Sequence, residues 1–454
     1  RRMANLAFFE ISAVTAAEVE SVIENPDPAL ATSNVVDIQD VSNITFEGFV
    51  VQSLNALCPS SNDHLVRVYA HTTAVDSVVI RNNVIGPNTN DGGQDGTCGR
   101  MGLYLALPNY TDGYDITNSQ IVGNKIFDAQ GNGNNVFIWG GAENYNATAR
   151  GDLSGTVIGD NEIYGSHRSG IEISGSADNL TIRDNTIYDN SGLPGDDSTA
   201  LKYGNGIVII RQGSDAASLS GEGPDGLTIT GNEIYGNQKN GIYMGPVNSN
   251  HTLSGNTIRN NGWDGVRIDF DESYHSTAVA VYGATSGIAL TSNSITANTG
   301  YGAQVIGTPT NGFMLDARQV WWGDASGPGD VGPGSGDEIS ANVIYCPWLD
   351  GDLPSGTPTS SDGNVVENVN SGELFCTIQD ALDDADTVNG HSIVAWTGTY
   401  TESLLITKEI ELSGQPGTVL YPSVSDPDCR VAGSPCGLNT SNMILVRADN
   451  VTIH

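Results

Sequence analysis

The stretch GLTITGNEIYGNQKNGI, residues 226–242, contains the repeating unit of this chain. Apolar and polar residues alternate in Leu227-Thr228-Ile229, then two small residues precede Asn232, and Ile234 belongs to a second alternating run. Alternation with a period of two predicts a β-strand that buries one face. The stretch therefore predicts two short strands joined by a tight turn at Asn232.

The same frame recurs along the chain, with two Asn-to-Asn steps of 24 residues (161 to 185 and 232 to 256). Longer steps contain loop-like insertions. Self-similarity at such a period predicts a solenoid whose turns stack in parallel. The other copies are Val78, Ile80, Asn83, Ile85; Ser119, Ile121, Asn124, Ile126; Thr156, Ile158, Asn161, Ile163; Leu180, Ile182, Asn185, Ile187; His251, Leu253, Asn256, Ile258; Ile288, Leu290, Asn293, Ile295; and, with Phe in place of Asn, Ile44, Phe46, Phe49, Val51.

Composition limits the classes of function. The chain has 454 residues, of which 53 are acidic and 18 basic, and its net charge is −35. This balance argues against nucleic-acid binding, which needs cationic patches, and predicts a solvated, self-repelling surface. The sequence contains no run of 18 apolar residues, so it predicts no membrane span. With an even number of cysteines, we expect a secreted, extracellular or cell-surface protein.

The six cysteines are disulfide candidates. Cys429 and Cys436 are close enough in sequence to close a small loop, and two others fall in loops beside the early turns. The resulting pairing, 58–98, 346–376 and 429–436, is one of 15 possible connectivities. The candidates are Cys58, Cys98, Cys346, Cys376, Cys429 and Cys436.

The asparagines of the frame are expected to form a ladder in the turns. Asparagine tolerates left-handed backbone geometry, and its amide can hydrogen-bond the next asparagine of the stack. The structural ladder is favoured over a ligand site. The predicted ladder is Asn83, Asn124, Asn161, Asn185, Asn232, Asn256 and Asn293.

Seven Asn-x-Ser/Thr sequons are candidates for N-glycosylation. Several arise because the frame itself contains Asn-apolar-Thr. Asn109 and Asn146 lie in insertions instead and are the better candidates. The remaining sequon residues are Asn43, Asn179, Asn250, Asn439 and Asn450.

One segment, WDGVRIDFDESYH at residues 263–275, concentrates carboxylates and basic groups. A polysaccharide lyase would use such carboxylates to hold Ca²⁺ and an arginine as base, and a hydrolase would use a carboxylate pair. Because acidic residues are frequent throughout the chain, a solvated face is the favoured interpretation. We therefore assign no catalytic or metal-binding residue, and Ca²⁺ remains the one possible cofactor. The residues concerned are Asp264, Arg267, Asp269, Asp271, Glu272 and His275.

The pattern changes after the solenoid run. We expect a β-helix module over residues 1–350, already in progress in residues 1–32 and closed by residues 317–349. A polar linker, 351–365, precedes the start of a second β-helix module at 366–454. LFCTIQDALDDADTVNG, residues 374–390, predicts a short capping helix near 376–386 with Phe375, Ile378 and Leu382 on one face.

This second segment resembles the pectin-lyase-like right-handed parallel β-helix proteins of the secreted and cell-surface type. Such proteins commonly start with a TIQ helix followed by a GTYxE strand, matched by Thr377-Ile378-Gln379 and by Gly398-Thr399-Tyr400 with Glu402. The resemblance implies an all-β, right-handed parallel β-helix. It implies no particular activity, because this fold carries many functions. The catalytic motifs of polygalacturonase-like and alginate-epimerase-like members are absent from the sequence.

The two ends of the chain also resemble each other. IELSG at 410–414 is similar to FEISA at 9–13, and SNMILVRADNVTI at 441–453 is similar to SNVVDIQDVSNITF at 33–46. We expect a window on a tandem array, or a module whose ends continue one another. The predicted function is a structural β-helix module of an extracellular, cell-surface or filamentous assembly that self-associates. The alternatives are a polysaccharide-degrading enzyme and a glycan-binding adhesin of the same fold.

Overall fold

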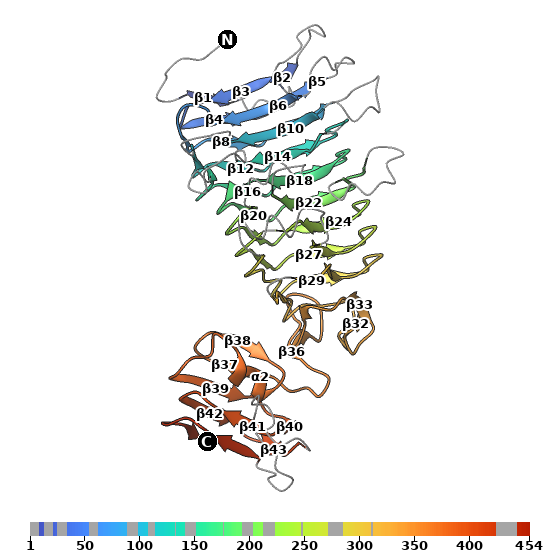
Figure 1. The fold of residues 1–454 in the computed structure, drawn as a ribbon. Helices are drawn as coiled ribbons and strands as arrows, with labels where there is room; N and C mark the ends of the chain where they lie inside the picture. The colour runs from blue at the N-terminus through green and yellow to red at the C-terminus, as the bar shows by residue number, and fades with distance from the viewer. Residues whose placement is uncertain are drawn as a thin grey trace. The chain divides into compact units, whose positions relative to one another are not determined.

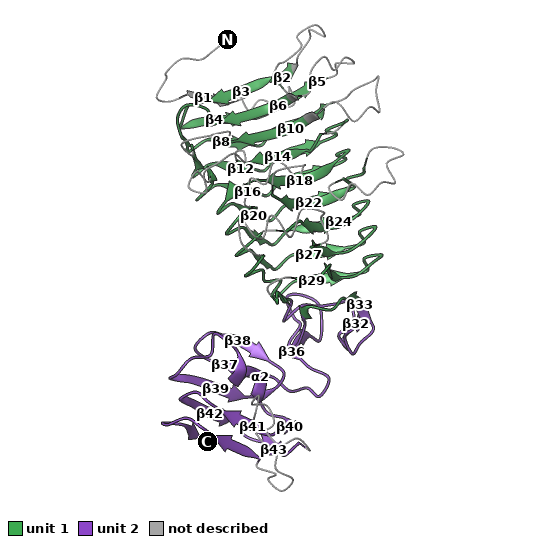
Figure 2. Cartoon of the chain, in the orientation of Figure 1, with its two compact units in different colours: residues 1–316, 337–343 green, residues 317–336, 344–454 purple. Residues whose placement is uncertain are grey.

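The computed structural model describes residues 9–12, 21–24, 34–53, 62–88, 99–107, 114–131, 133–140, 151–175, 177–192, 203–211, 223–246, 248–270, 285–309, 312–423 and 443–454. The chain divides into two compact units (Figure 2). Unit 1 consists of residues 1–316 and 337–343, and unit 2 of residues 317–336 and 344–454. Most of the predicted closing segment, 317–349, therefore groups with unit 2, whereas the sequence suggested a boundary at 350.

Unit 1 is a parallel β-helix, in which each turn of the chain adds one strand to each of three sheets, A, B and C (Figure 1). Sheet A contains β1 (Phe9–Ser12), β4 (Ile44–Glu47), β8 (Val79–Arg81), β12 (Gln120–Val122), β16 (Val157–Gly159), β20 (Thr181–Arg183), β23 (Thr228–Thr230) and β26 (Thr252–Ser254). Sheet B contains β2 (Ser21–Glu24), β5 (Phe49–Ser53), β9 (Val84–Asn88), β13 (Lys125–Phe127), β17 (Glu162–Tyr164), β21 (Thr186–Tyr188), β24 (Glu233–Tyr235), β27 (Thr257–Arg259) and β29 (Ser294–Thr296). Sheet C contains β3 (Val36–Gln39), β6 (Asn62–Tyr69), β10 (Gly99–Ala106), β14 (Val136–Trp139), β18 (Ser169–Ser174), β22 (Asn205–Ile210), β25 (Ile242–Met244), β28 (Val266–Asp269), β30 (Ala303–Ile306) and β33 (Gly336–Ile339).

Short strands and bridges continue some turns beyond sheet C. They are β7 (Val75–Asp76), which pairs with β11 (Ile116–Thr117), β15 (Gly151–Asp152), which pairs with β19 (Ala177–Asp178), and β31 (Leu315–Asp316).

The interior of unit 1 is a stack of aliphatic side chains held in register. Ile182 of β20 pairs with Ile158 on one side and with Ile229 on the other. These side chains are 0% exposed, whereas the flanking residues Thr228 and Thr230 are partly exposed. Burial of an isoleucine contributes about 1.5–3 kcal/mol relative to exposure. The period-two alternation therefore predicts the buried face correctly.

The seven predicted asparagines lie in the turn between sheets A and B and are buried. The Nδ2 of each of the first six donates to the Oδ1 of the next one; Asn161 donates to Asn185 at 2.9 Å and Asn232 to Asn256 at 3.0 Å. The same Oδ1 accepts the backbone N–H of the preceding asparagine, and Nδ2 also donates to a carbonyl of the preceding turn, as Asn232 does to Ile182 at 3.0 Å. Each amide thus joins three consecutive turns.

The left-handed residue of this turn is not the ladder asparagine, contrary to our expectation. It is the residue before it, for example Asp184 with φ of 55° and Gly231 with φ of 65°. The chain bends at this position between sheets A and B, and the next side chain is buried. The frame therefore alternates among Gly, Asp, Asn and Ser at that place.

A second asparagine ladder lies in the turn between sheets B and C. Asn190 Nδ2 donates to Asn237 Oδ1 at 2.8 Å, Asn237 to Asn261 at 2.9 Å, and Asn261 to Asn298 at 3.0 Å. The last member donates to Asp337 Oδ2 at 3.0 Å. Burial raises the pKa of Asp337, which the hydrogen bonds from residues 297 and 298 oppose.

Three polar residues occupy the otherwise apolar first position of the frame. Each accepts the backbone N–H of the equivalent residue one turn earlier: Ser119 from Val78 at 3.1 Å, Thr156 from Ser119 at 3.3 Å, and His251 Nδ1 from Leu227 at 3.2 Å. His251 is 1% exposed, and its Nε2 has no hydrogen-bond partner. Burial lowers the pKa of His251 to about 4.

Unit 2 contains a smaller sheet in which an antiparallel hairpin precedes three parallel strands. Its first strands, β37 and β38, pair antiparallel with each other, and β37 pairs antiparallel with β39. The elements are β32 (Pro328–Asp330), β34 (Val343–Ile344), β35 (Trp348–Leu349), β36 (Pro358–Thr359), β37 (Val366–Asn368), β38 (Glu373–Phe375), α2 (Ile378–Asp383), β39 (His391–Ala395), β40 (Thr399–Thr401), β41 (Leu404–Ile406), β42 (Ile410–Gly414), β43 (Val419–Tyr421), β44 (Ile444–Val446) and β45 (Thr452–Ile453).

The motif residues of unit 2 fix helix α2 to the sheet. Thr377 accepts the N–H of Asp380, and Glu402 accepts the first two helical N–H groups at 2.9 and 3.0 Å. Gln379 exchanges two hydrogen bonds with the backbone of Leu405, at 2.8 and 3.1 Å. The TIQ and GTYxE segments thus cap the helix and dock it on β41.

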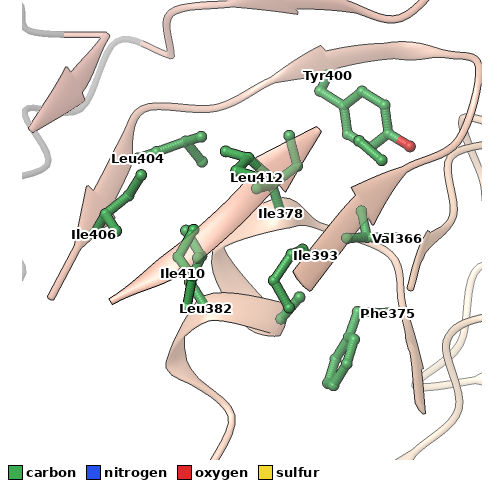
Figure 3. Packing of buried hydrophobic residues seen from close by; sticks show 12 residues of the cluster. Val366, Phe375, Ile378, Leu382, Ile393, Tyr400, Leu404, Ile406, Ile410 and Leu412 are labelled. Carbon is green, nitrogen blue, oxygen red and sulfur yellow. The ribbon is translucent and has the colours of Figure 1, made fainter. Parts of the chain in front are cut away.

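The predicted apolar face of the helix is buried in the core of unit 2 (Figure 3). The helix is shorter than the expected 376–386, because Thr377 is its N-cap and the backbone of Asp384 is no longer helical. Phe375 belongs to β38. The core cluster consists of Val366, Phe375, Ile378, Ala381, Leu382, Ile393, Ala395, Tyr400, Leu404, Ile406, Ile410 and Leu412.

The similar end segments pair in the same register within their own units. In unit 1, Glu10 pairs with Thr45, and Ile11 with Phe46. In unit 2, Glu411 pairs with Thr452, and Leu412 with Ile453. The two units therefore contain equivalent pairs of turns.

A charge in the interior tests the assigned register. Ile229→Asp places an unpaired carboxylate at a 0% exposed position, which costs several kcal/mol. We expect loss of cooperative unfolding or a fall of at least about 3 kcal/mol in stability by urea denaturation. Thr230→Asp, on the opposite face of the same strand, is the matched control and is expected to change stability by less than about 1 kcal/mol. Equal effects of the two substitutions would show that the register is wrong.

The buried histidine predicts an acid-sensitive stability. The unfolded chain binds a proton at His251 near pH 6.5 and the folded chain only near pH 4, so stability falls as the pH drops through this window. His251→Leu removes this dependence. We expect urea denaturation to show wild type losing about 2–3 kcal/mol relative to the variant between pH 7 and pH 4.5. The exposed His71→Leu is the control, and parallel pH profiles for His251→Leu and wild type would refute the prediction.

Candidate functional site

The outer face of sheet C carries the side chains of unit 1 that are the best candidates for a functional site. Side chains that point away from the interior fall in register along the sheet. One such row passes through Glu172 of β18, Tyr243 of β25 and Arg267 of β28. The complete row is Asp37, Arg67, Tyr104, Phe137, Glu172, Val208, Tyr243, Arg267 and Gln304.

Arg267 is the centre of the segment that the sequence singled out. Its guanidinium lies 3.2 Å from Asp269 Oδ2 and 3.6 Å from Asp264 Oδ2. The alternation with Ile268 places Arg267 and Asp269 on the outer face together, as that pattern indicates. Both carboxylates are nearly buried, at 2% exposure for Asp269 and 4% for Asp264.

Asp264 has a structural place that the sequence did not reveal. Asn205 Oδ1 accepts Asn240 Nδ2 at 2.8 Å, Asn240 Oδ1 accepts the Asp264 N–H at 3.2 Å, and Asp264 Oδ1 accepts the Tyr301 N–H at 2.9 Å. Asp264 thus continues a third amide ladder. Burial raises the pKa of Asp264, while the Tyr301 N–H and Arg267 oppose this shift.

A second ion pair lies on the same face three strands away. Arg168 Nε is 2.8 Å from Glu172 Oε2, and its Nη2 donates to Oε1 at 2.9 Å. Asn134 Nδ2 also donates to Glu172, at 2.9 Å. Three strand spacings separate Glu172 from Asp269 by about 14 Å. This separation exceeds the roughly 5–9.5 Å between the paired carboxylates of glycosidases.

The aromatic residues of the outer surface stack on each other. On sheet B, Phe127, Tyr164, Tyr188 and Tyr235 form a column with ring centroids 5.3, 4.9 and 5.2 Å apart. Arg259 covers the far face of Tyr235 at 4.6 Å. On sheet C, Tyr104 stacks on Phe137 at 5.3 Å. Because neighbouring turns cover the ring faces, these columns present ring edges, whereas a sugar packs against a ring face.

Trp263 is similarly placed between cations. Lys239 Nζ lies 4.9 Å from its ring and the Arg267 guanidinium 5.8 Å. Trp263 is 36% exposed, and Lys239 is 3% exposed. The tryptophan therefore holds the cations of two adjacent turns.

A possible metal-binding group lies in unit 2. Carboxylate oxygens of Glu373, Asp384 and Asp386 lie within 4.8 Å of one another. Glu373 is already paired with Arg318 at 3.0 Å, so a cation there would compete with that guanidinium. The sequence did not single out this group, and Ca²⁺ binding stays a prediction.

The predicted cysteines and sequon asparagines are only partly described by the structure. Cys346 and Cys376 form a disulfide with a Cα–Cα distance of 5.8 Å. Asn43, Asn179, Asn250 and Asn450 are exposed. Several candidates lie outside the residues that the structure describes: Asp271, Glu272, His275, Cys58, Cys98, Cys429, Cys436, Asn109, Asn146 and Asn439.

The second asparagine ladder was missed although the sequence contains a signal for it. Asn190, Asn237, Asn261 and Asn298 each follow a member of the first ladder by five residues (for example 190 − 185 and 237 − 232).

No helix in the described part of the chain is long and apolar enough to cross a membrane.

Comparison with known proteins gives one family and one relative by sequence. The family described as right handed beta helix region matches residues 151–315. A cell surface glycoprotein of Methanothermus fervidus is 31% identical over 88 residues. This match covers 19% of the present chain and 12% of that protein.

The comparison with solved structures gives distant matches. The mannuronan C-5 epimerase AlgE6 A-module of Azotobacter vinelandii is 12% identical with a TM-score of 0.40, covering 92% of this chain and 88% of that one. The enzymatically active domain of bacteriophage CBA120 tailspike protein 2 is 12% identical with a TM-score of 0.42, covering 72% and 44%. The stacked parallel sheets and the family match over residues 151–315 identify unit 1 as a right-handed parallel β-helix.

Proposed function

We propose that this chain is an extracellular structural protein, a β-helix module of a cell-surface or filamentous assembly that associates with itself. The observation that carries the proposal is the pairing of outer-surface groups between adjacent turns. On the described outer surface, the aromatic column of sheet B and several charged side chains contact partners on the adjacent turn. A surface of this kind suits a load-bearing rod better than an active site.

The ion pairs of the outer surface illustrate this pairing. Arg81 contacts Glu47 at 2.7 Å on sheet A, and Arg259 contacts Glu233 at 2.6 Å on sheet B. Each partner belongs to an adjacent strand. Exposed pairs of this type contribute at most about 1 kcal/mol each. Their repetition along the axis nevertheless fixes the stacking of consecutive turns.

The surface location rests on further support. The relative with a detectable sequence match is a cell surface glycoprotein, although the match spans only 12% of it. A net charge of −35 keeps separate molecules apart in dilute salt, and salt or divalent cations weaken this repulsion by screening the charge.

A polysaccharide-acting enzyme or a glycan-binding adhesin is the second candidate. It is favoured by Arg267, which is held between two nearly buried carboxylates on the outer face of sheet C. Perturbed pKa values are frequent at catalytic sites, and burial raises the pKa of Asp264. The ladder contacts of Asp264 weigh against this candidate.

Salt-dependent assembly tests the structural role. The Debye length falls from about 30 Å at 0.01 M salt to about 3 Å at 1 M, which removes repulsion between the acidic surfaces. We expect sedimentation and electron microscopy of the full chain to show monomers at low salt and elongated assemblies at high salt or protein concentration. Dispersed monomers under all conditions would refute the assembly.

A polysaccharide panel separates the two candidates. The structural role predicts no release of reducing or unsaturated ends above the level of an Asp269→Asn control. Asp269→Asn is instead expected to lower stability by about 1–3 kcal/mol, because Arg267 loses a charged partner. Product release by wild type that Asp269→Asn abolishes, with the melting curve retained, would favour the enzyme.

A further inference from the structure

Three of the exposed sequon asparagines of unit 1 occupy one column. The column consists of the left-handed residues that come before the strands of sheet A. Their backbone N–H groups donate to carbonyls of the next turn, as Asn179 does to Asp225 and Asn250 to Ser286. All of its members have φ between 49° and 73°. In order along the axis they are Asn43, Ser77, Asn118, Gly155, Asn179, Gly226, Asn250 and Gly287.

The side chains of Asn179 and Asn250 lie along the axis in the same way. Nδ2 of Asn179 donates to Asp152 at 2.9 Å, and Nδ2 of Asn250 donates to Asp225 at 2.8 Å. An amide nitrogen has two hydrogens, so one remains after this bond. Both residues are exposed, and the residue two positions later, which completes the sequon, lies on the outer face of a sheet-A strand.

Glycines on either side leave space for these asparagines. A Cβ on Gly226 would lie 2.6 Å from Asn179 Oδ1, and a Cβ on Gly287 would lie 2.7 Å from Asn250 Oδ1. The next turn thus presents no Cβ beside the amide oxygen of Asn179 or Asn250. One turn separates the two asparagines, which corresponds to about 10 Å along the axis.

We propose that Asn43, Asn179 and Asn250 carry N-linked oligosaccharides, which form a row along the sheet-A edge of unit 1. In this transfer the C1–O bond of a lipid-linked pyrophosphate oligosaccharide breaks, Nδ2 bonds to C1, and Nδ2 loses one proton to a base. Asn450 has the same left-handed geometry before β45 of unit 2 and is a fourth site. The proposal rests on secretion, which is one part of the proposed function, but not on self-association.

The row also has a consequence for assembly. N-linked glycans are bulky and hydrophilic. A glycan at every second turn covers the sheet-A edge between residues 179 and 250. Lateral contacts between modules then have to use sheets B and C.

The simpler interpretation is that sequons arise here without modification. A left-handed turn favours Asn, and the outer face of a strand favours Thr. Asn118 separates the two interpretations, because it shares the geometry but is followed by Ser119-Gln120 and is no sequon. Its φ is 49°, its Nδ2 donates to Asp76 at 2.8 Å, and its Oδ1 lies against Gly155.

The test is glycopeptide mass spectrometry of the full chain, secreted from a host with N-glycosylation. A reporter sequon in an appended flexible tag shows that the pathway acts on the chain. We expect glycan on Asn43, Asn179 and Asn250, and none on Asn118. Thr181→Ala should remove the glycan at Asn179, and the variant should still unfold in one cooperative transition. Gln120→Thr should create one at Asn118, since it adds the missing hydroxyl to the same geometry.

Unmodified Asn179 and Asn250 together with a modified reporter would overturn the proposal. An unmodified Asn118 in Gln120→Thr would overturn the claim that the column position makes an asparagine accessible. Both outcomes are independent of assembly, which sedimentation measures separately. Failure of the glycan row is therefore distinguishable from failure of the structural role.

Discussion

The hydrogen bonds of buried asparagine amides are the constraint on which unit 1 depends. Asn232 is 1% exposed; it accepts from the N–H and Nδ2 of Asn185 in one turn and donates to Asn256 in the next. A buried polar group that loses its partner costs about 1–3 kcal/mol, so each turn is held at the position its neighbours require. The aliphatic stack supplies most of the driving force but tolerates sliding, because one isoleucine is much like another. The amides remove that freedom and set the register.

The same principle extends from the interior to the surface. Asp264, which by sequence belongs to a candidate catalytic segment, accepts the Tyr301 N–H in the manner of a ladder asparagine. Its negative charge is then balanced by Arg267, which also contacts Asp269. Burial and pKa perturbation, usual signs of a reactive site, here follow from the replacement of an amide by a carboxylate in a ladder. Asp337, at the end of the second ladder, has the same combination of burial and raised pKa. A perturbed carboxyl in a solenoid is therefore weaker evidence of catalysis than it would be in a globular enzyme.

The sequence predicts the periodic features well, because a side chain that repeats at a fixed place meets its own copy in the next turn. The buried isoleucines, the first ladder and the outward direction of Asp269 follow from alternation alone. Features set by non-periodic contacts were not predicted. The left-handed residue is Asp184 rather than Asn185, because the turn must be completed before the amide can point inward. Helix α2 is shorter than expected because it starts after the cap residue Thr377 and ends before Asp384, whose backbone is no longer helical.

The cap of unit 2 shows how a solenoid solves the opposite problem, an apolar interior with no preceding turn. A helix can cover that interior only if its own free N–H groups are satisfied. Glu402, from the loop between β40 and β41, accepts two of them, while Gln379 pairs with the backbone of Leu405 as a neighbouring strand would. The cap therefore imitates a turn with side chains in place of a strand. The motif that resembles secreted β-helix proteins is explained by this requirement for closure, without reference to any substrate. In both units the distinctive residues serve stacking, which is the property that a structural role at a cell surface requires.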